Sequence, residues 1–261
     1  ETGNAVAVKC VLRNDLNPSD DAAVYDEVAI LSSLQHPHIV PILDFFAEKD
    51  CYFIVMELMR GGDLFDRIGK KKSYSEADAR DLIVKMLKAV SICHQHSIAH
   101  CDMKPKNLLL VSEVDDSYIK IADFGFAARV HEPKSLTKQC GTPFFVAPEI
   151  LTQRPYDQQV DMWSVGCIIF LLLSGSLPFK GRSQKDLFQN IIAGKYEFNS
   201  EVWEGVSEDA IDLVKNLLVV NPDKRYTAKK ALLHPWIKVE TCRLSKNGLL
   251  STSQRLKTFN A

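Results

Sequence analysis

The chain has no hydrophobic run long enough to cross a lipid bilayer. Its longest apolar stretch is VGCIIFLLL at 165–173, whereas a membrane-spanning helix needs about 20 apolar residues. We therefore interpret this stretch as a buried helix and expect no membrane span. No secretory signal is visible either, although the sequence begins with Glu1 rather than with methionine.

The cysteines have no pairing pattern. Seven are scattered along the 261 residues, and no two form a C-x-x-C pair. An odd, unpatterned set argues against a disulfide framework and against a structural zinc site. It favours reduced thiols, and hence a cytosolic or nuclear compartment.

An excess of charge of one sign is also lacking. The chain has 32 Lys and Arg against 33 Asp and Glu, a formal net charge of −1. No nucleic-acid-binding footprint is expected from such a balance. Hydrophobic residues make up 46% of the sequence, enough for a sizeable core in one large domain or two lobes.

The sequence contains no internal repeat and changes character near residue 60. Strands are predicted over 5–12 and 51–58, and a helix over 20–34, where apolar residues recur at helical spacing. Beyond the glycine break at 60–63 the pattern is helical. Helices are predicted over 75–95, with Ser75 as N-cap, and over 158–174, 184–193, 207–218 and 227–233. A small β-rich part followed by a larger helical part indicates an α+β protein.

Three motifs follow one another in the helical part. They are HCDMKPKN at 100–107, DFG at 123–125 and APE at 147–149. A tripeptide alone is weak evidence, because it occurs by chance in roughly 3% of chains of this length. An isolated Asp or Asn is usually an exposed polar loop residue. In this order and spacing, however, the motifs supply the base, the cation and the two metal ligands that phosphoryl transfer requires.

With these motifs the chain resembles a eukaryotic protein kinase over nearly all of its length. The resemblance implies a two-lobed kinase fold. A truncated N-lobe and hinge would occupy residues 1–59, a C-lobe residues 60–237, and the start of a regulatory tail residues 238–261. It also implies ATP as co-substrate and Mg²⁺ as cofactor.

The resemblance assigns catalytic roles residue by residue. Asp102 would accept the proton of the substrate hydroxyl, and Lys104 would contact the transferring phosphate. A lysine at this position resembles the motif of serine/threonine kinases more than that of tyrosine kinases. Asn107 and Asp123 would bind Mg²⁺, which prefers oxygen ligands. Thr142, in CGTPFF, would bond both Asp102 and Lys104 and help to recognise the hydroxyl substrate.

The nucleotide site is assigned in the same way. Lys9, in AVAVK, would reach the α- and β-phosphates and pair with Glu27, unless both are merely solvated. Ala7 and Leu109 would enclose the adenine, and Met56 would lie at the back of its pocket.

The connecting strand from Glu57 to Met59 would bond the base. Asp63 would bond the ribose and receive a basic side chain three residues before the phosphorylated one. Asp63 could equally be a helix N-cap, and the two roles can coexist.

Several further residues would support the site. Four are expected to stack as an apolar spine: Leu31, Ile42, His100 and Phe124. His100 is therefore interpreted as a packing residue and not as the base. Asp161 would anchor the catalytic-loop backbone, and Glu149 would form a buried ion pair with Arg225.

The chain departs from the kinase pattern at two places. Cys101 stands where the family has an arginine that receives an activation-loop phosphate through bidentate hydrogen bonds. Activity is therefore expected not to depend on phosphorylation within 126–146. The glycine-rich G-x-G-x-x-G loop is also missing from the 261 residues, which predicts impaired catalysis by this stretch alone. These departures keep a pseudokinase or scaffold open. Two further alternatives are a small-molecule kinase of the same architecture and a redox or metal-binding role for Cys101 beside His100.

Three longer strings are similar to the calmodulin-dependent kinase group: DMWSVGCIIFLLLSGSLPF, NPDKRYTAKKALLHPWI and QRLKTFNA. The HCD triplet also occurs in kinases resembling protein kinase D. The group implies protein substrates with basic residues near the target serine or threonine. It also implies a calmodulin-binding segment beyond Ala261.

Overall fold

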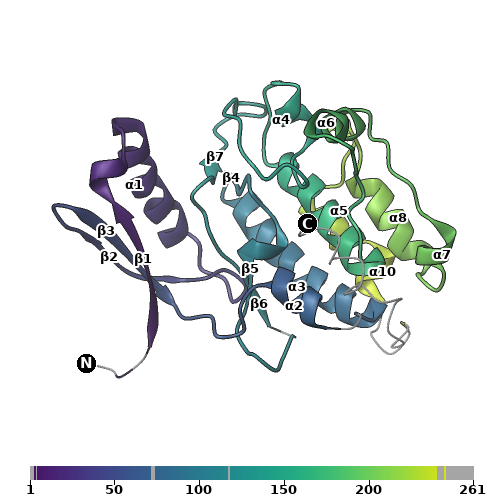
Figure 1. Ribbon diagram of the computed structural model, residues 1–261, viewed down its shortest axis with the longest axis horizontal. Helices are drawn as coiled ribbons and strands as arrows, with labels where there is room; N and C mark the ends of the chain where they lie inside the picture. The colour runs from purple at the N-terminus through teal and green to yellow at the C-terminus, as the bar shows by residue number, and fades with distance from the viewer. Residues whose placement is uncertain (1–2, 4, 72–73, 117, 240–243, 245–261) are drawn as a thin grey trace.

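The computed structural model describes residues 3, 5–71, 74–116, 118–239 and 244. An antiparallel sheet with one helix forms the N-terminal part, and a larger helical part follows it (Figure 1). The predicted α+β architecture is thus confirmed. The lobe boundary between residues 59 and 60 stays a prediction, and nearly all of the predicted tail at 238–261 lies outside the described residues.

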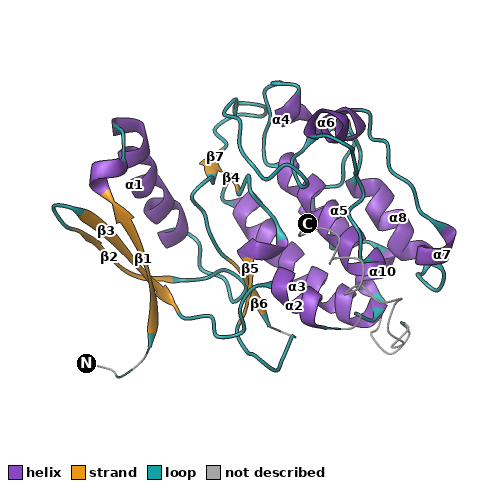
Figure 2. Cartoon of the chain, viewed as in Figure 1, coloured by secondary structure: helices purple, strands orange, loops and turns teal. Residues whose placement is uncertain are grey.

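The N-terminal sheet has three strands, coloured orange in Figure 2. They are β1 (Val6–Leu12), β2 (Ile42–Ala47) and β3 (Cys51–Glu57), in the spatial order β1-β3-β2. The two predicted strands are confirmed, but β2 was not predicted. Its register shifts between Ile42 and Asp44, and a bulge of this kind breaks the alternation by which a strand is recognised in a sequence.

Helix α1 (Pro18–Ser32) covers the sheet and begins earlier than the predicted residue 20. The side chain of Asn17 caps the helix by accepting hydrogen bonds from the backbone N–H groups of Ser19 and Asp20, at 2.9 and 3.0 Å. Pro18 then occupies the first helical position, where its fixed φ suits the helix and its missing N–H costs nothing. The helix buries Glu27 beside its apolar face, and so places a carboxylate toward β1.

Two long helices form the centre of the helical part. Helix α3 (Glu76–Gln95) begins with a capping box between Ser75 and Asp78, which confirms Ser75 as the predicted N-cap. Helix α5 (Gln159–Ser174) is buried along nearly its whole length, so the apolar stretch is a core helix as predicted. No helix in the described part of the chain is long and apolar enough to span a membrane.

Shorter helices surround this centre. They are α2 (Leu64–Lys70), α4 (Pro148–Leu151), α6 (Gln184–Ile192), α7 (Ser200–Trp203), α8 (Glu208–Leu217), α9 (Ala228–Ala231) and α10 (Pro235–Lys238). The predicted helix at 227–233 is wrong in length, because α9 ends at Ala231. Pro235 disfavours a helical conformation at the residue before it, and a new helix starts there.

Two pairs of short strands hold the motif loops. Strand β4 (Ile98–Ala99) pairs with β7 (Ala128–Arg129), and β5 (Leu108–Leu110) pairs with β6 (Ile119–Ile121). The segment 100–107 therefore runs from β4 to β5, and the segment 122–127 runs from β6 to β7. This arrangement brings the HCDMKPKN and DFG motifs to the same end of the two strand pairs.

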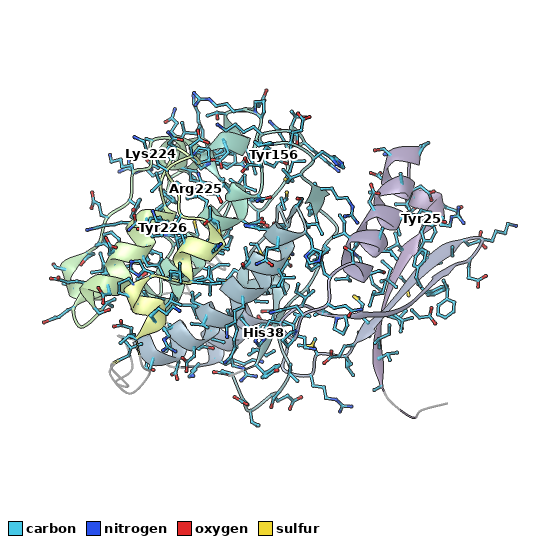
Figure 3. The ribbon with its side chains drawn as sticks, turned by 180° about the vertical axis from the view of Figure 1, so that it is seen from behind. Tyr25, His38, Tyr156, Lys224, Arg225 and Tyr226 are labelled. Atoms are coloured by element: carbon cyan, nitrogen blue, oxygen red, sulfur yellow. The ribbon has the colours of Figure 1, made fainter. Side chains whose placement is uncertain are left out.

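The predicted ion pair in the helical part is confirmed. Arg225, labelled in Figure 3, donates two hydrogen bonds to the carboxylate of Glu149, at 2.7 and 3.0 Å. Both residues are buried. The pair joins α4, which carries the APE motif, to the loop that follows α8.

Candidate active site

A buried carboxylate from α5 fixes the backbone of the catalytic loop. The two oxygens of Asp161 accept hydrogen bonds from the N–H groups of His100 and Cys101, both at 2.9 Å. His94, at the end of α3, lies 2.9 Å from the same carboxylate. Burial would raise the pKa of Asp161, but the hydrogen bond and charge of His94 and the backbone donor outweigh it, so the pKa is lowered.

The anchored residues themselves are constrained. Cys101 has a φ of 66°, a left-handed conformation that is strained for a residue with a side chain. His100 is buried with both ring nitrogens in use. Its Nδ1 accepts from the N–H of Asp102 at 3.3 Å, and its Nε2 lies 3.1 Å from the carbonyl of Ala122. The ring packs edge-on to Phe124 with centroids 4.8 Å apart, so His100 has a packing role.

Asp102 is the next residue, and its side chain is held from two sides. Thr142 donates its hydroxyl to Oδ1 at 2.7 Å, and Lys104 Nζ lies 2.5 Å from Oδ2. Lys104 also donates to the Thr142 hydroxyl at 3.1 Å. Asn107 donates to the backbone carbonyl of Asp102 at 2.8 Å. The three other residues that were predicted to be catalytic, Lys104, Asn107 and Thr142, therefore all contact Asp102.

The predicted strand lysine also meets its partners. Lys9 on β1 lies 2.8 and 2.9 Å from the two oxygens of Glu27 on α1, and 3.6 Å from Asp123 of the DFG motif. A Cβ at Gly125 would stand 3.4 to 3.7 Å from Asp123, Glu27 and Lys9. These are ordinary van der Waals distances, so Gly125 lies directly beside the point where the three charged groups meet.

Two side-chain oxygens are available for a divalent cation. The amide nitrogen of Asn107 is used for Asp102, while no described residue donates a hydrogen bond to its oxygen. Asp123 is half-exposed and, within the described residues, its carboxylate meets only Lys9. One carboxylate and one amide oxygen fit Mg²⁺, which usually takes few protein ligands and completes its shell with water and phosphate.

The residues predicted to hold the base lie around the sheet and β5. Ala7 on β1 is directly opposite Met56 on β3. Leu109 on β5 forms an isolated bridge with Asp63. Asp63 is the N-cap of α2, accepting from the N–H of Asp66 at 2.8 Å, which confirms the capping role.

The connecting strand shows a pair that was not predicted. The carboxylate of Glu57 pairs with Lys120 on β6. Met59 is partly buried. The Glu57–Lys120 pair, like that of His94 with Asp161, joins residues more than 60 positions apart, so no local pattern signals either.

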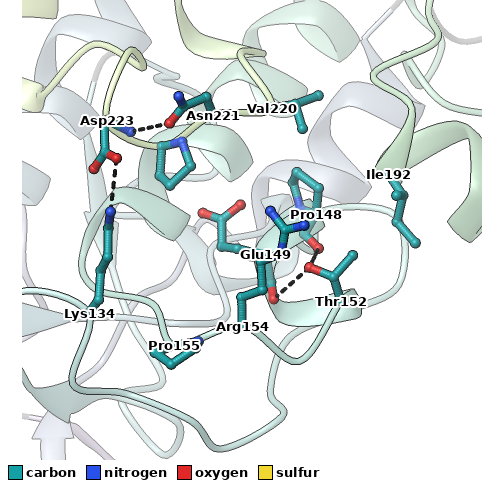
Figure 4. Close-up of a pocket in the computed structure, with 11 residues that line it drawn as sticks. Lys134, Pro148, Glu149, Thr152, Arg154, Pro155, Ile192, Val220, Asn221 and Asp223 are labelled. Atoms are coloured by element: carbon teal, nitrogen blue, oxygen red, sulfur yellow. Dashed lines mark hydrogen bonds and ion pairs between the residues drawn. The ribbon is translucent and has the colours of Figure 1, made fainter.

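A cavity of about 790 Å³ lies away from these residues. It is lined by side chains that include Lys134, Glu149, Arg154 and Asp223, with Ile192 at its edge (Figure 4). Its carboxylates are already paired, Glu149 with Arg225 and Asp223 with Lys134. None of the predicted catalytic residues lines this cavity, so volume alone does not locate the chemistry.

Comparison with known proteins decides the family. Residues 1–237 match the model of the protein kinase domain. The chain belongs to the protein kinase family. It is 40% identical to a calcium/calmodulin-dependent protein kinase type 1 from Macrobrachium nipponense, over 98% of this chain and 74% of that protein.

Other relatives agree. Human calcium/calmodulin-dependent protein kinase type 1B is 40% identical over 98% of this chain and 75% of its own length. Myosin light chain kinase A of Dictyostelium discoideum is 41% identical over 91% of this chain and 81% of its own length. The kinase is thus a serine/threonine kinase of the calmodulin-dependent kinase group, as the sequence indicated.

Replacing Asp161 by asparagine should destabilise this kinase. Hydrogen bonds to a charged group are each worth ~1.5–3 kcal/mol. In the variant, the amide NH2 group would face a backbone N–H, and two donors cannot form a hydrogen bond. The lowered pKa means that the carboxylate stabilises fully above its unfolded-state pKa of about 4 and loses this effect as the pH falls through the lower folded-state value. Urea unfolding should therefore show a difference from wild type that is steady at about pH 6–8 and narrows below about pH 4.

The matched control is Asp26→Asn on the exposed face of α1, which should change the unfolding free energy by less than about 0.5 kcal/mol. Equal stability of Asp161→Asn and Asp26→Asn at neutral pH would contradict the anchoring role of Asp161.

Proposed function

We propose that this kinase transfers the γ-phosphoryl group of Mg-ATP to serine or threonine side chains of proteins, with Asp102 as the general base. The observation that carries this assignment is the contact of Thr142, a hydroxyl residue, with both Asp102 and Lys104. A substrate hydroxyl needs the same two partners, one to accept its proton and one to face the developing phosphate charge.

The remaining roles are assigned to the cluster of Lys9, Glu27 and Asp123 and to the side-chain oxygen of Asn107. Lys9, fixed by Glu27, would bind the phosphates of ATP. Asn107 and Asp123 would hold Mg²⁺, which neutralises phosphate charge when bound. The protein supplies mainly positioning here, because the transition state of phosphoryl transfer is loose and needs little covalent chemistry.

The sheet supports a further proposal about activity. β1 is an edge strand in the described sheet, and the 261 residues contain no glycine-rich loop. A polypeptide of residues 1–261 alone would leave the phosphates of ATP uncovered. We expect such a polypeptide to turn over more slowly than the full-length enzyme, because an uncovered phosphate is less well held and more exposed to water.

Regulation of the kinase is proposed from its relatives, and its cellular location from its cysteines. Because relatives of this chain are calcium/calmodulin-dependent kinases, we expect calmodulin to be a partner that binds a segment beyond Ala261. The string at 254–261 that suggests it lies outside the described residues. The unpatterned cysteines favour the cytosol or the nucleus.

The base is tested by Asp102→Asn in the full-length enzyme. Loss of a general base typically lowers turnover by ~10²–10⁴-fold, while the circular dichroism spectrum should stay unchanged. Wild-type turnover in the variant would refute the mechanism. A wild-type enzyme that transfers no phosphate would instead favour a pseudokinase.

Substrate preference is tested at Asp63. Peptides with arginine three residues before the target should be phosphorylated a few-fold better than peptides with alanine there, because a partly exposed charge pair is worth about 0.5–1 kcal/mol. Asp63→Ser keeps an oxygen that caps α2 but removes the charge, so it should abolish this preference without loss of stability. A preference that is the same in wild type and Asp63→Ser would rule out Asp63 as the recognition residue.

A further inference from the structure

Two cysteines far apart in the sequence meet beside the catalytic base. Cys101 immediately precedes Asp102 and is buried, and Cys140 stands two residues before Thr142 and is half-buried. The segments that carry them are in contact, because the residue after Cys140, Gly141, approaches the backbone carbonyl of Cys101. The sulfur of Cys140 also lies 3.1 Å from the hydroxyl of Tyr156, which donates to the carbonyl of Lys138 at 2.6 Å.

The backbone segments around the two cysteines lie in close contact. Gly141 has a φ of 100°, and a Cβ there would stand 3.1 Å from the carbonyl oxygen of Cys101. The next contact along both segments is the hydrogen bond from Thr142 to Asp102. Residues 140–142 of the activation segment therefore lie alongside residues 101–102 of the catalytic loop, with the thiol pair adjoining the catalytic contact.

We propose that Cys101 and Cys140 are a redox modification site, at which hydrogen peroxide forms a reversible disulfide that ties the activation segment to the catalytic loop and slows phosphoryl transfer. The bond itself needs only the two thiols and peroxide. Its effect on turnover rests on the proposed function.

The pKa values of the two thiols are shifted in opposite directions, so one cysteine is more reactive than the other. The hydrogen bond with Cys101 lowers the pKa of Cys140, and the same bond together with burial raises the pKa of Cys101. Cys140 is thus the readier thiolate, and the thiolate is the reactive form of cysteine. It is also the less buried of the two.

The reaction balances with one molecule of peroxide. The Cys140 thiolate attacks one peroxide oxygen, the O–O bond breaks, and the departing hydroxide takes a proton to become water. The sulfur of Cys101 then attacks the resulting sulfenic acid. An S–S bond forms as the S–O bond breaks, and the second hydroxide takes the proton of Cys101. Two thiols are oxidised, one peroxide is reduced and two waters form. A thiol reductant reverses the step by exchange.

The disulfide changes the geometry of the site. An S–S bond is about 2.0 Å long, shorter than any non-bonded contact between two sulfurs. Its formation must draw residue 140 toward residue 101 and so shift Thr142 relative to Asp102. A misplacement of about 1 Å at a reacting centre can cost ~10²-fold in rate, so we expect turnover to fall at least tenfold.

The test treats the reduced full-length enzyme with hydrogen peroxide and digests it without reductant. Tandem mass spectrometry should find a peptide that links Cys101 to Cys140. Turnover should fall at least tenfold and recover with dithiothreitol. Cys101→Ser and Cys140→Ser should each abolish the link and the rapid loss of activity. Cys51→Ser, which changes a partly buried cysteine on β3, should behave as wild type.

Two results would overturn the proposal. One is the absence of the linked peptide after peroxide treatment, which can be established whether or not the reduced enzyme is active. The other is inactivation of Cys101→Ser as fast as wild type, since oxidation of Cys140 alone would then suffice. A reduced enzyme without transferase activity that still forms the link would refute the proposed function and leave the modification site in place.

Discussion

The geometry of the active site depends on one buried carboxylate. Asp161, on a helix with almost no exposed surface, accepts hydrogen bonds from two consecutive backbone N–H groups of the catalytic loop. Those bonds hold Cys101 in a left-handed conformation that an unsupported residue would leave. The turn at Cys101 in turn directs Asp102 toward Lys104 and Thr142. A rigid core helix thus sets the position of a catalytic loop.

The N-terminal sheet also contributes a charged residue to the site. Lys9 on β1 contacts both Glu27, which is buried on α1, and Asp123 of the DFG motif. Charges from a strand, a helix and a loop therefore meet through non-covalent contacts alone. Such a site suits phosphoryl transfer, in which positioning and charge neutralisation supply most of the catalysis. It is also easily disturbed by any change that moves one element relative to another.

The sequence predicted elements whose signals are local. Ser75 and the apolar stripe after it define α3, and the uninterrupted apolar stretch defines α5. The prediction failed where the local signal is weak or interrupted, as at the start of α1, which Asn17 caps, and in the bulged strand β2. The residues proposed to be catalytic were predicted from motif order, which encodes spatial proximity that no propensity contains.

Contacts between distant residues that no motif of the family links could not be predicted in this way. Cys101 and Cys140 are 39 positions apart, and the sequence left a redox role open for Cys101 but gave no sign of Cys140 as its partner. Their meeting depends on the close backbone approach at Gly141. The pair of His94 with Asp161 was likewise visible only once α3 and α5 were packed together. Such contacts arise from tertiary packing, and they are where the structure adds most to the sequence.

The most direct measurement is single-turnover phosphoryl transfer by wild type and Asp161→Asn with saturating Mg-ATP and a serine peptide. If Asp161 acts by positioning Asp102, the chemical step should slow at least tenfold, because misplaced catalytic groups lose rate steeply. The affinity for ATP should stay within about twofold, since Lys9 and Glu27 are untouched. An unchanged chemical step, or a loss confined to ATP affinity, would contradict the account.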